Sequence, residues 1–284
     1  MSVDAATLRL PDGEPPVLLF DSPHSGRLYP ADFETAATGP ALRRGEDAYV
    51  DELIAPAAAL GVAVLSATYP RCYIDVNRAV DDLDADLLAE PWPGPLQPTE
   101  KSRRGLGLIR RFVTPGVPVH ARALTVAEVR RRIDEVYEPY HRRLRGLLEA
   151  LRRERGFAWL VDWHSMKSVG NAMTPDGEGS RRPDFVVGDL DGRSATPALT
   201  DLLVSGLRGR GYTVALNDPY RGGTIVQRYG RPGEGVHVVQ VEMSRGLYLD
   251  EATVTTHQGF GPLQRDLMAL TGDLVAAARL HRLE

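Results

Sequence analysis

Residues 157–165, FAWLVDWHS, end in side chains that could bind a metal ion. A short apolar run between Gly156 and a polar segment is typical of a buried strand. Because side chains alternate along a strand, we expect Asp162 and His164 on the same face. An imidazole with a carboxylate beside it fits a metal ligand and the partner that orients its ring. A lone histidine is more often a core residue that simply forms a hydrogen bond, so a metal site requires further residues at the same place.

Polar or charged side chains also close three other predicted strands. They are His24 in the turn after residues 17–21, Asp75, Asn77 and Arg78 at the end of residues 70–78, and Glu242 at the end of residues 236–242. Strands that alternate with helices predict an α/β fold, with a mainly parallel or mixed twisted sheet and helices on both faces. Ligands of such sheets bind beyond the carboxyl ends of the strands. We therefore expect these side chains to meet at one rim.

The remaining elements must support that rim. Predicted strands cover residues 17–21, 62–68, 70–78, 157–165, 184–188, 212–216 and 236–242, with 106–113 as a further candidate, and predicted helices cover 46–60, 126–155, 197–209 and 261–280. Thr125 and Glu128 form a capping-box pattern before the second helix, which we expect to bend at Pro139. Segments 81–102, 169–182 and 217–235 are predicted to be loops. No linker or repeat is evident, so a single domain over residues 1–284 is expected.

Composition excludes several classes of protein. The 284 residues have 43% hydrophobic content and a formal net charge of −4, which does not indicate a nucleic-acid-binding surface. Cys72 is the only cysteine, so an internal disulfide and a thiolate zinc cluster are excluded. Residues 1–16 lack the apolar core of a secretory signal, and the longest apolar stretch, 54–65, is too short to cross a bilayer. We expect a cytoplasmic protein that does not bind membranes.

The residue types at the rim limit the metal and the reaction. Two histidines and one carboxylate, with a position left for water, are the usual composition of a catalytic zinc site. Zinc polarises a carbonyl and lowers the pKa of water. A further carboxylate must then move a proton from the water to the leaving amine, and Glu242 is our candidate for this base.

Several motifs together are similar to one known family, the N-formylglutamate amidohydrolases. They are PHSG (23–26), DAYVDEL (47–53), PRCYIDVNR (70–78), DWHS (162–165), NDPYRGG (217–223) and VEMSRGLYLDE (241–251). The resemblance implies a zinc-dependent hydrolase that splits N-formyl-L-glutamate into formate and glutamate, a late step in histidine degradation. It also implies a fold like that of the zinc carboxypeptidases. The family includes members whose substrate is not settled, so the reaction type is better specified than the acyl substrate.

The resemblance also implies roles for individual residues. His24 and His164 would bind one zinc ion together with a carboxylate of the DAYVDEL segment. Asp47, placed in the first turn of the predicted helix 46–60, is our choice for this third ligand, and Asp51 and Glu52 remain alternatives. A carboxylate at a helix start is equally well explained by the helix dipole.

Arginines complete the expected site. Asn77 and Arg78 resemble the Asn-Arg pair with which zinc carboxypeptidases hold a substrate carboxylate, and Arg245 could bind the second carboxylate. Arg71 is placed to polarise the formyl carbonyl. We interpret Asp75 as a structural residue that orients these arginines.

Three other interpretations stay open. A metal-independent hydrolase could use Ser165 or Ser25, although neither lies in a GxSxG elbow. A related zinc enzyme could act on another N-acyl amino acid or a small peptide. A protein of a different class could bind a carboxylate ligand without turnover. The sequence indicates a small-molecule N-acyl amino acid as the partner and leaves the oligomeric state open.

Overall fold

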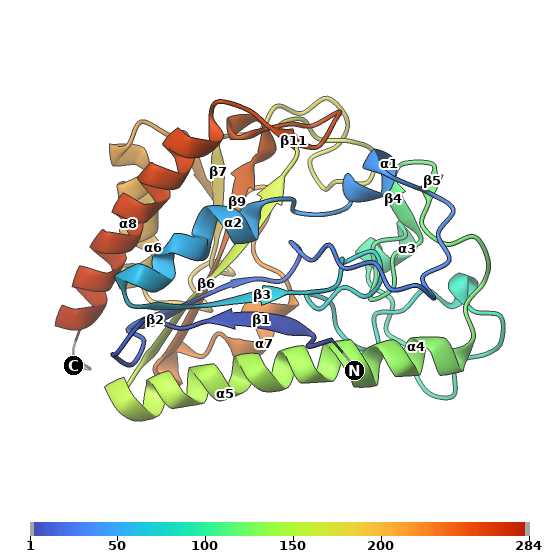
Figure 1. Ribbon diagram of the computed structural model, residues 1–284, viewed down its shortest axis with the longest axis horizontal. Helices are drawn as coiled ribbons and strands as arrows, with labels where there is room; N and C mark the ends of the chain where they lie inside the picture. The colour runs from blue at the N-terminus through green and yellow to red at the C-terminus, as the bar shows by residue number, and fades with distance from the viewer. Residues whose placement is uncertain (1–2, 282–284) are drawn as a thin grey trace.

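The apolar runs predicted as strands pair into one seven-stranded sheet in the computed structural model, which describes residues 3–281 (Figure 1). The strand order across the sheet is β1 (Ala6–Arg9), β3 (Val62–Ala67), β2 (Leu18–Ser22), β6 (Ala158–Met166), β9 (Val236–Ser244), β7 (Phe185–Gly188) and β8 (Val214–Leu216). The four central strands β3, β2, β6 and β9 are parallel to one another, whereas β1 and β7 pair antiparallel with their inner neighbours. The predicted mixed sheet is therefore confirmed.

Helices cover both faces of this sheet. Successive residues of a strand point to opposite faces, so Leu19 joins one buried cluster while Leu18 and Phe20 join the other. The first cluster includes buried residues of α5 (Glu138–Arg155). The second includes residues of α2 (Val50–Ile54), α6 (Pro197–Gly209) and α8 (Phe260–Leu280). In Figure 1, α5 runs along the lower side of the sheet and α8 lies at the left.

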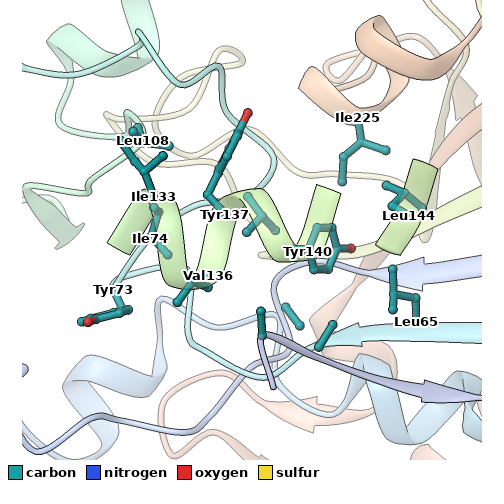
Figure 2. Packing of buried hydrophobic residues seen from close by; sticks show 14 of the residues in the cluster. Leu65, Tyr73, Ile74, Leu108, Ile133, Val136, Tyr137, Tyr140, Leu144 and Ile225 are labelled. Carbon is teal, nitrogen blue, oxygen red and sulfur yellow. The ribbon is translucent and has the colours of Figure 1, made fainter. Parts of the chain in front are cut away.

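The α5 side of the core shows how the helix is held on the sheet. Tyr140 and Leu144 of α5 belong to the same buried cluster as Leu65 of β3 and Ile225 of α7 (Thr224–Tyr229), as Figure 2 shows. Full burial of one such leucine contributes roughly 1.5–3 kcal/mol. Spacing by four residues places Tyr140 and Leu144 on one helix face, which fixes that face towards the strands.

The long predicted helix begins as expected and is interrupted near Pro139. Thr125 and Glu128 form the complete capping box of α4 (Val126–Arg132), which confirms the predicted start. One π-helical turn (Ile133–Tyr137) then separates α4 from α5. Proline has no N–H to donate to the carbonyl four residues earlier, and a π turn is a common way to accommodate such a local break.

The predicted helix over residues 46–60 was wrong at its start. Tyr49 has φ of 65°, a left-handed conformation, so the α-helix begins only at Val50. Asp47 thus precedes the helix instead of lying in its first turn. The second half, Ala55–Leu60, is a 3-10 helix. Pro56 cannot donate to the carbonyl of Glu52, which accepts a hydrogen bond from Gln264 instead.

The predicted strand over residues 70–78 was also wrong. This segment consists of turns, in which Tyr73 N donates to Pro70 O and the side chain of Asp75 accepts from Asn77 N. A short polar side chain that bonds to the following backbone favours a turn over an extended strand. The candidate strand 106–113 is reduced to β4 (Phe112–Thr114), which pairs with β5 (Val117–Pro118).

Other short elements were not predicted. They are β1, the helices α1 (Pro40–Arg43), α3 (Glu100–Arg103) and α7, the 3-10 helices Ala85–Leu87, Pro232–Glu234 and Arg245–Leu247, and the pair β10 (Leu249–Asp250) and β11 (Thr255–Thr256). The segment 217–235, predicted as a loop, therefore contains α7 and one of these 3-10 helices. Within residues 3–281, no helix has the length and apolar character that crossing a membrane requires.

Candidate active site

Two histidines converge on one carboxylate at the rim of the sheet. Nδ1 of His164 lies 3.0 Å from Oδ2 of Asp47, and Nδ1 of His24 lies 3.3 Å from the same oxygen. All three side chains are buried. One ligand atom from each residue lies within 4.8 Å of the other two, close enough to surround one metal ion.

Separate strand ends position the two histidines, and a backbone hydrogen bond positions Asp47. His24 follows β2, and His164 lies near the carboxyl end of the neighbouring parallel strand β6. Asp47 is tied to the first histidine because its backbone N–H donates to His24 O at 3.0 Å. Gly26 allows the turn after His24 to lie on the chain that leaves β3, since a Cβ there would lie 2.0 Å from Tyr69 O.

A second carboxylate orients each histidine. Nε2 of His24 lies 2.6 Å from Oδ1 of Asp75, and Nε2 of His164 lies 2.8 Å from Oδ1 of Asp162. Such partners hold the proton on Nε2 and leave the Nδ1 lone pair available to a metal. The pairing of Asp162 with His164 is the one that alternation along the strand predicted. The contact of Asp75 with His24 was missed, because we had assigned Asp75 only to its arginine neighbours.

Local charges keep the carboxylates ionised. Burial by itself would raise the pKa of Asp47, but the close contacts with His164 and His24, together with the charge of Arg71, outweigh it and hold that pKa well below its usual range. Burial would also raise the pKa of Asp75, but Arg71 and His24 hold it well below its ordinary value. Two ionised carboxylates beside the imidazoles are the charge state that favours binding of a cation.

One nitrogen in this group has no protein partner. Nδ1 of His24 is buried and forms no hydrogen bond with any residue in the described range 3–281. Burial, followed by the charge of Arg71, lowers the pKa of His24, so the ring is held neutral. A buried polar atom without a partner normally indicates a missing ion, water or ligand. The unpaired nitrogen and its set of N and O donors fit a zinc ion.

Glu242 faces the same rim from the next strand. It pairs in register with His164 across β6 and β9, so both side chains leave the same face of the sheet. Gln240 donates to Oε1 of Glu242 at 3.0 Å, while its own Oε1 accepts from Gly223 N. Burial, against the opposing charge of His164, raises the pKa of Glu242. A half-buried carboxylate with a raised pKa is suited to accept and return a proton.

The rim opens into a cavity of about 650 Å³ whose wall is strongly cationic. The lysines and arginines on this wall are Arg44, Arg71, Arg78, Lys101, Arg104, Arg110, Lys167, Arg182, Arg193, Arg221 and Arg245. The carboxylates on the described part of the wall are Asp47, Glu100 and Glu242. Such an excess of positive charge favours an anionic ligand.

Comparison with known proteins shows the family of the chain. Residues 17–249 match the family model for N-formylglutamate amidohydrolase. The chain belongs to the N-formylglutamate amidohydrolase family. An N-formylglutamate deformylase of Pseudomonas aeruginosa is 33% identical over 238 residues, 82% of each chain. An enzyme of the same name from Pseudomonas putida is 30% identical over 245 residues, 85% of each chain.

Solved structures show the same relationship. A crystal structure of N-formylglutamate amidohydrolase from Ralstonia eutropha JMP134 has a TM-score of 0.91 and 44% identity, and the match covers 98% of this chain and 99% of that one. A gene product of Agrobacterium tumefaciens has a TM-score of 0.67 at 19% identity, with coverage of 96% and 94%. The second likeness concerns the fold alone.

Within this N-formylglutamate amidohydrolase family member, the alternative third ligands lie apart from the histidines. Asp51 and Glu52 form ion pairs with Arg27 at 3.2 and 2.6 Å.

The serines proposed for a metal-independent reaction form hydrogen bonds with other residues. Oγ of Ser25 accepts from Asp51 N, and Oγ of Ser165 accepts from Arg245. In residues 3–281 neither serine forms a hydrogen bond with a histidine, so a Ser-His pair is absent from the described site.

The residues predicted to bind the substrate line the cavity, but two of them are held by the protein. Oδ1 of Asn77 accepts from Ile225 N at 2.8 Å, and its Nδ2 lies 3.0 Å from Nε2 of His164. Arg245 donates to Asp47 and Ser165, each at 3.0 Å, and to backbone carbonyls. These contacts favour a positioning role for both side chains, with Arg245 holding the metal-ligand candidate Asp47.

Two other predicted arginines keep part of their guanidinium towards the cavity. Arg71 donates through Nε and Nη2 to Oδ2 of Asp75, and its Nη1 lies 3.6 Å from Asp47. Arg78 donates to the carbonyls of Leu106 and Asn77 through Nε and Nη1. Both side chains are on the wall of the cavity, where the sequence interpretation requires them.

Sequence reasoning overlooked other residues of the wall. Arg182 forms a two-bond ion pair with Asp176, and its guanidinium lies 5.2 Å from the ring centre of Tyr220. Arg110 is buried on the same wall. No sequence signal separates Arg110 from its neighbour Arg111, because both lie in a loop whose path is set by distant contacts.

Proposed function

We propose that this protein is a zinc-dependent amidohydrolase that cleaves the formyl amide of N-formyl-L-glutamate, or of a closely similar N-acyl amino acid, to the free acid and the amine. Membership of the amidohydrolase family and the names of its relatives support the reaction type. The observation that carries the proposal is the buried group of His24, Asp47 and His164 at the base of an arginine-rich cavity.

The metal would be held by three atoms. These are Nδ1 of His24, Nδ1 of His164 and a carboxylate oxygen of Asp47, a mixed N and O donor set that suits zinc. When bound, zinc supplies a Lewis acid that polarises the amide carbonyl and makes a water molecule more acidic. Asp75 and Asp162 would keep the two rings in the orientation and tautomer that such binding needs.

Glu242 would carry the proton during the reaction. In its ionised form it removes a proton from the attacking water, and it then donates this proton to the amide nitrogen as the carbon–nitrogen bond breaks. The raised pKa of Glu242 favours this exchange, because the carboxylate of a weaker acid accepts a proton more readily. Arg71 would donate to the carbonyl oxygen while negative charge accumulates on it.

The cationic wall supports an acidic substrate. N-formylglutamate carries two carboxylates, and Arg78, which lines the cavity, would bind one of them with charge-assisted hydrogen bonds. Asn77 and Arg245 would act on the substrate indirectly, because Asn77 donates to Asp162, the partner of His164, and Arg245 donates to Asp47.

A formate-release assay combined with metal analysis tests the proposal. We expect about one zinc ion per chain and formate release from N-formyl-L-glutamate, with slower release from N-formyl amino acids that have neutral or basic side chains. Absence of bound metal together with full activity after exhaustive chelation would contradict the metal-dependent reaction. Tight glutamate binding without product would instead indicate a binding protein.

A further inference from the structure

Three arginines on the cavity wall are buried. Their exposed fractions are 7% for Arg78, 7% for Arg110 and 8% for Arg245. A buried guanidinium normally satisfies its N–H groups with acceptors, because an unpaired buried charge is strongly destabilising. Arg78 and Arg245 follow this rule through hydrogen bonds to carbonyl and side-chain oxygens.

Arg110 does not follow it. Its side chain forms no hydrogen bond with any residue in the range 3–281, and its Nε is buried without a partner. The nearby carboxylate is Asp75, whose Oδ2 lies 3.6 Å from Nε, beyond hydrogen-bond distance. That oxygen already accepts two hydrogen bonds from Arg71. The guanidinium of Arg110 therefore lies on the cavity wall with its donors unused.

The charged groups next to Arg110 also favour binding of an anion. Asp75 is one carboxylate next to Arg71, Arg78 and Arg110, and it also binds His24. Burial, together with the charge of Arg71, lowers the pKa of Arg110 to about 10. Guanidinium groups that lower one another's pKa gain most from an additional anion between them. An anion bound at Arg110 would therefore be stabilised by more than one guanidinium group.

We propose that Arg110 binds one of the two carboxylates of the substrate and so determines the preference for N-acyl diacids. This inference rests on the proposed function, in which Arg78 binds the other carboxylate. The position suits the role, because Arg110 and the metal-ligand candidate His24 line the same cavity and both lie next to Asp75. A planar guanidinium with free N–H groups can bind a carboxylate through two parallel hydrogen bonds.

The test compares three substrates in the zinc-loaded enzyme. N-formyl-L-glutamate has both carboxylates, N-formyl-L-glutamine lacks the side-chain carboxylate, and 4-formamidobutyrate lacks the α-carboxylate. For Arg110→Gln, we expect kcat/KM for N-formylglutamate to fall about 10- to 100-fold, the loss typical of a charge-assisted pair. For the analogue that lacks the carboxylate bound by Arg110, we expect kcat/KM to change by less than about 3-fold.

Arg111→Gln is the matched control. Arg111 is the next residue, pairs with Asp84 and Asp86 at 3.2 and 3.4 Å, and is not on the cavity wall. We expect this variant to keep the substrate preference of the wild type. Arg110→Lys, which keeps the charge without the planar fork, should recover part of the lost selectivity.

The proposal is overturned if Arg110→Gln lowers kcat/KM by the same factor for all three substrates, or leaves it unchanged for N-formylglutamate. If the wild-type protein hydrolyses none of them, the proposed function fails, and the role of Arg110 is decided by binding of glutarate. Glutarate should then raise the Tm of the wild type and of Arg111→Gln more than that of Arg110→Gln. Equal shifts in all three proteins would overturn the role of Arg110.

Discussion

Glu242 and His164 lie directly opposite each other in the register of β9 and β6. Because parallel strands in register place paired side chains on the same face of the sheet, the proposed base and a proposed metal ligand share one rim. Their separation is set by the spacing between neighbouring strands, about 4.8 Å at the backbone. The relationship therefore depends on two adjacent strands of the core and on no flexible loop.

Replacement of Glu242 by glutamine should separate catalysis from metal binding. The amide has nearly the same shape but cannot accept a proton from water, so we expect kcat to fall about 10²- to 10⁴-fold. Zinc content should stay at the wild-type level, measured by elemental analysis, since Glu242 is not one of the proposed ligands. Normal turnover by this variant would show that another group is the base.

Removal of the metal should abolish activity and also lower stability. A ligand that binds only the folded state stabilises it by about 2.7 kcal/mol when its concentration is 100 times Kd. We therefore expect chelation to lower the Tm of the wild type and added zinc to restore both Tm and formate release. His164→Ala should show neither the zinc-dependent rise in Tm nor activity. A zinc response that persists in this variant would place the metal elsewhere.

Replacement of Asp75 by asparagine should weaken zinc binding although Asp75 is not a proposed ligand. The change removes the negative charge that faces Nε2 of His24 and Arg71, and it leaves one acceptor oxygen in place of two. Loss of such a supporting carboxylate typically lowers metal affinity about 10- to 100-fold, which a competition titration with a chelator measures. Asp176→Asn, which breaks the ion pair with Arg182, is the control and should keep the zinc affinity. Equal affinities for both variants would contradict the supporting role.

The free energy of unfolding should decrease in acid because buried His141 resists protonation in the folded protein. Its Nδ1 contacts the Tyr229 hydroxyl and its Nε2 the carbonyl of Val76, just before Asn77. Burial, followed by the charge of Arg228, lowers the pKa of His141 from 6.5 to about 3. Between these values the unfolded chain binds a proton that the folded protein does not bind, so the free energy of unfolding falls as the pH decreases below about 6.5.

Urea unfolding at a series of pH values measures this effect. His141→Gln should be less stable than the wild type near neutral pH, because it loses a well-packed ring, and should lose less stability between pH 6.5 and 4. His120 also has its pKa lowered to about 3 and adds to the acid sensitivity of both proteins. The test therefore compares the slope of unfolding free energy against pH in the wild type with that in His141→Gln. Parallel curves would exclude His141 as a source of the acid sensitivity.

The sequence predicted the sheet better than the segments between strands. Continuous apolar runs such as residues 157–165 can be satisfied only by burial on both faces of a sheet, so their strands were found. Residues 70–78 alternate between polar and apolar side chains as a strand would, but the side chain of Asp75 accepts a hydrogen bond from the backbone of Asn77 and makes a turn. Local pattern did not distinguish these two outcomes.

By itself, the sequence determined which residues reach the rim, since His24, His164 and Glu242 each belong to or follow a strand whose direction is fixed by its apolar pattern. The family motifs added Asp47 as the choice among neighbouring carboxylates. The tertiary structure alone decided that Asp75 supports His24, that Arg245 holds Asp47 and that the side chain of Arg110 forms no hydrogen bond within residues 3–281. These relationships join residues 51 to 198 positions apart or depend on a missing contact. Local sequence does not encode them, because hydrogen bonding and charge depend on which distant side chains the packed chain brings within about 3 Å.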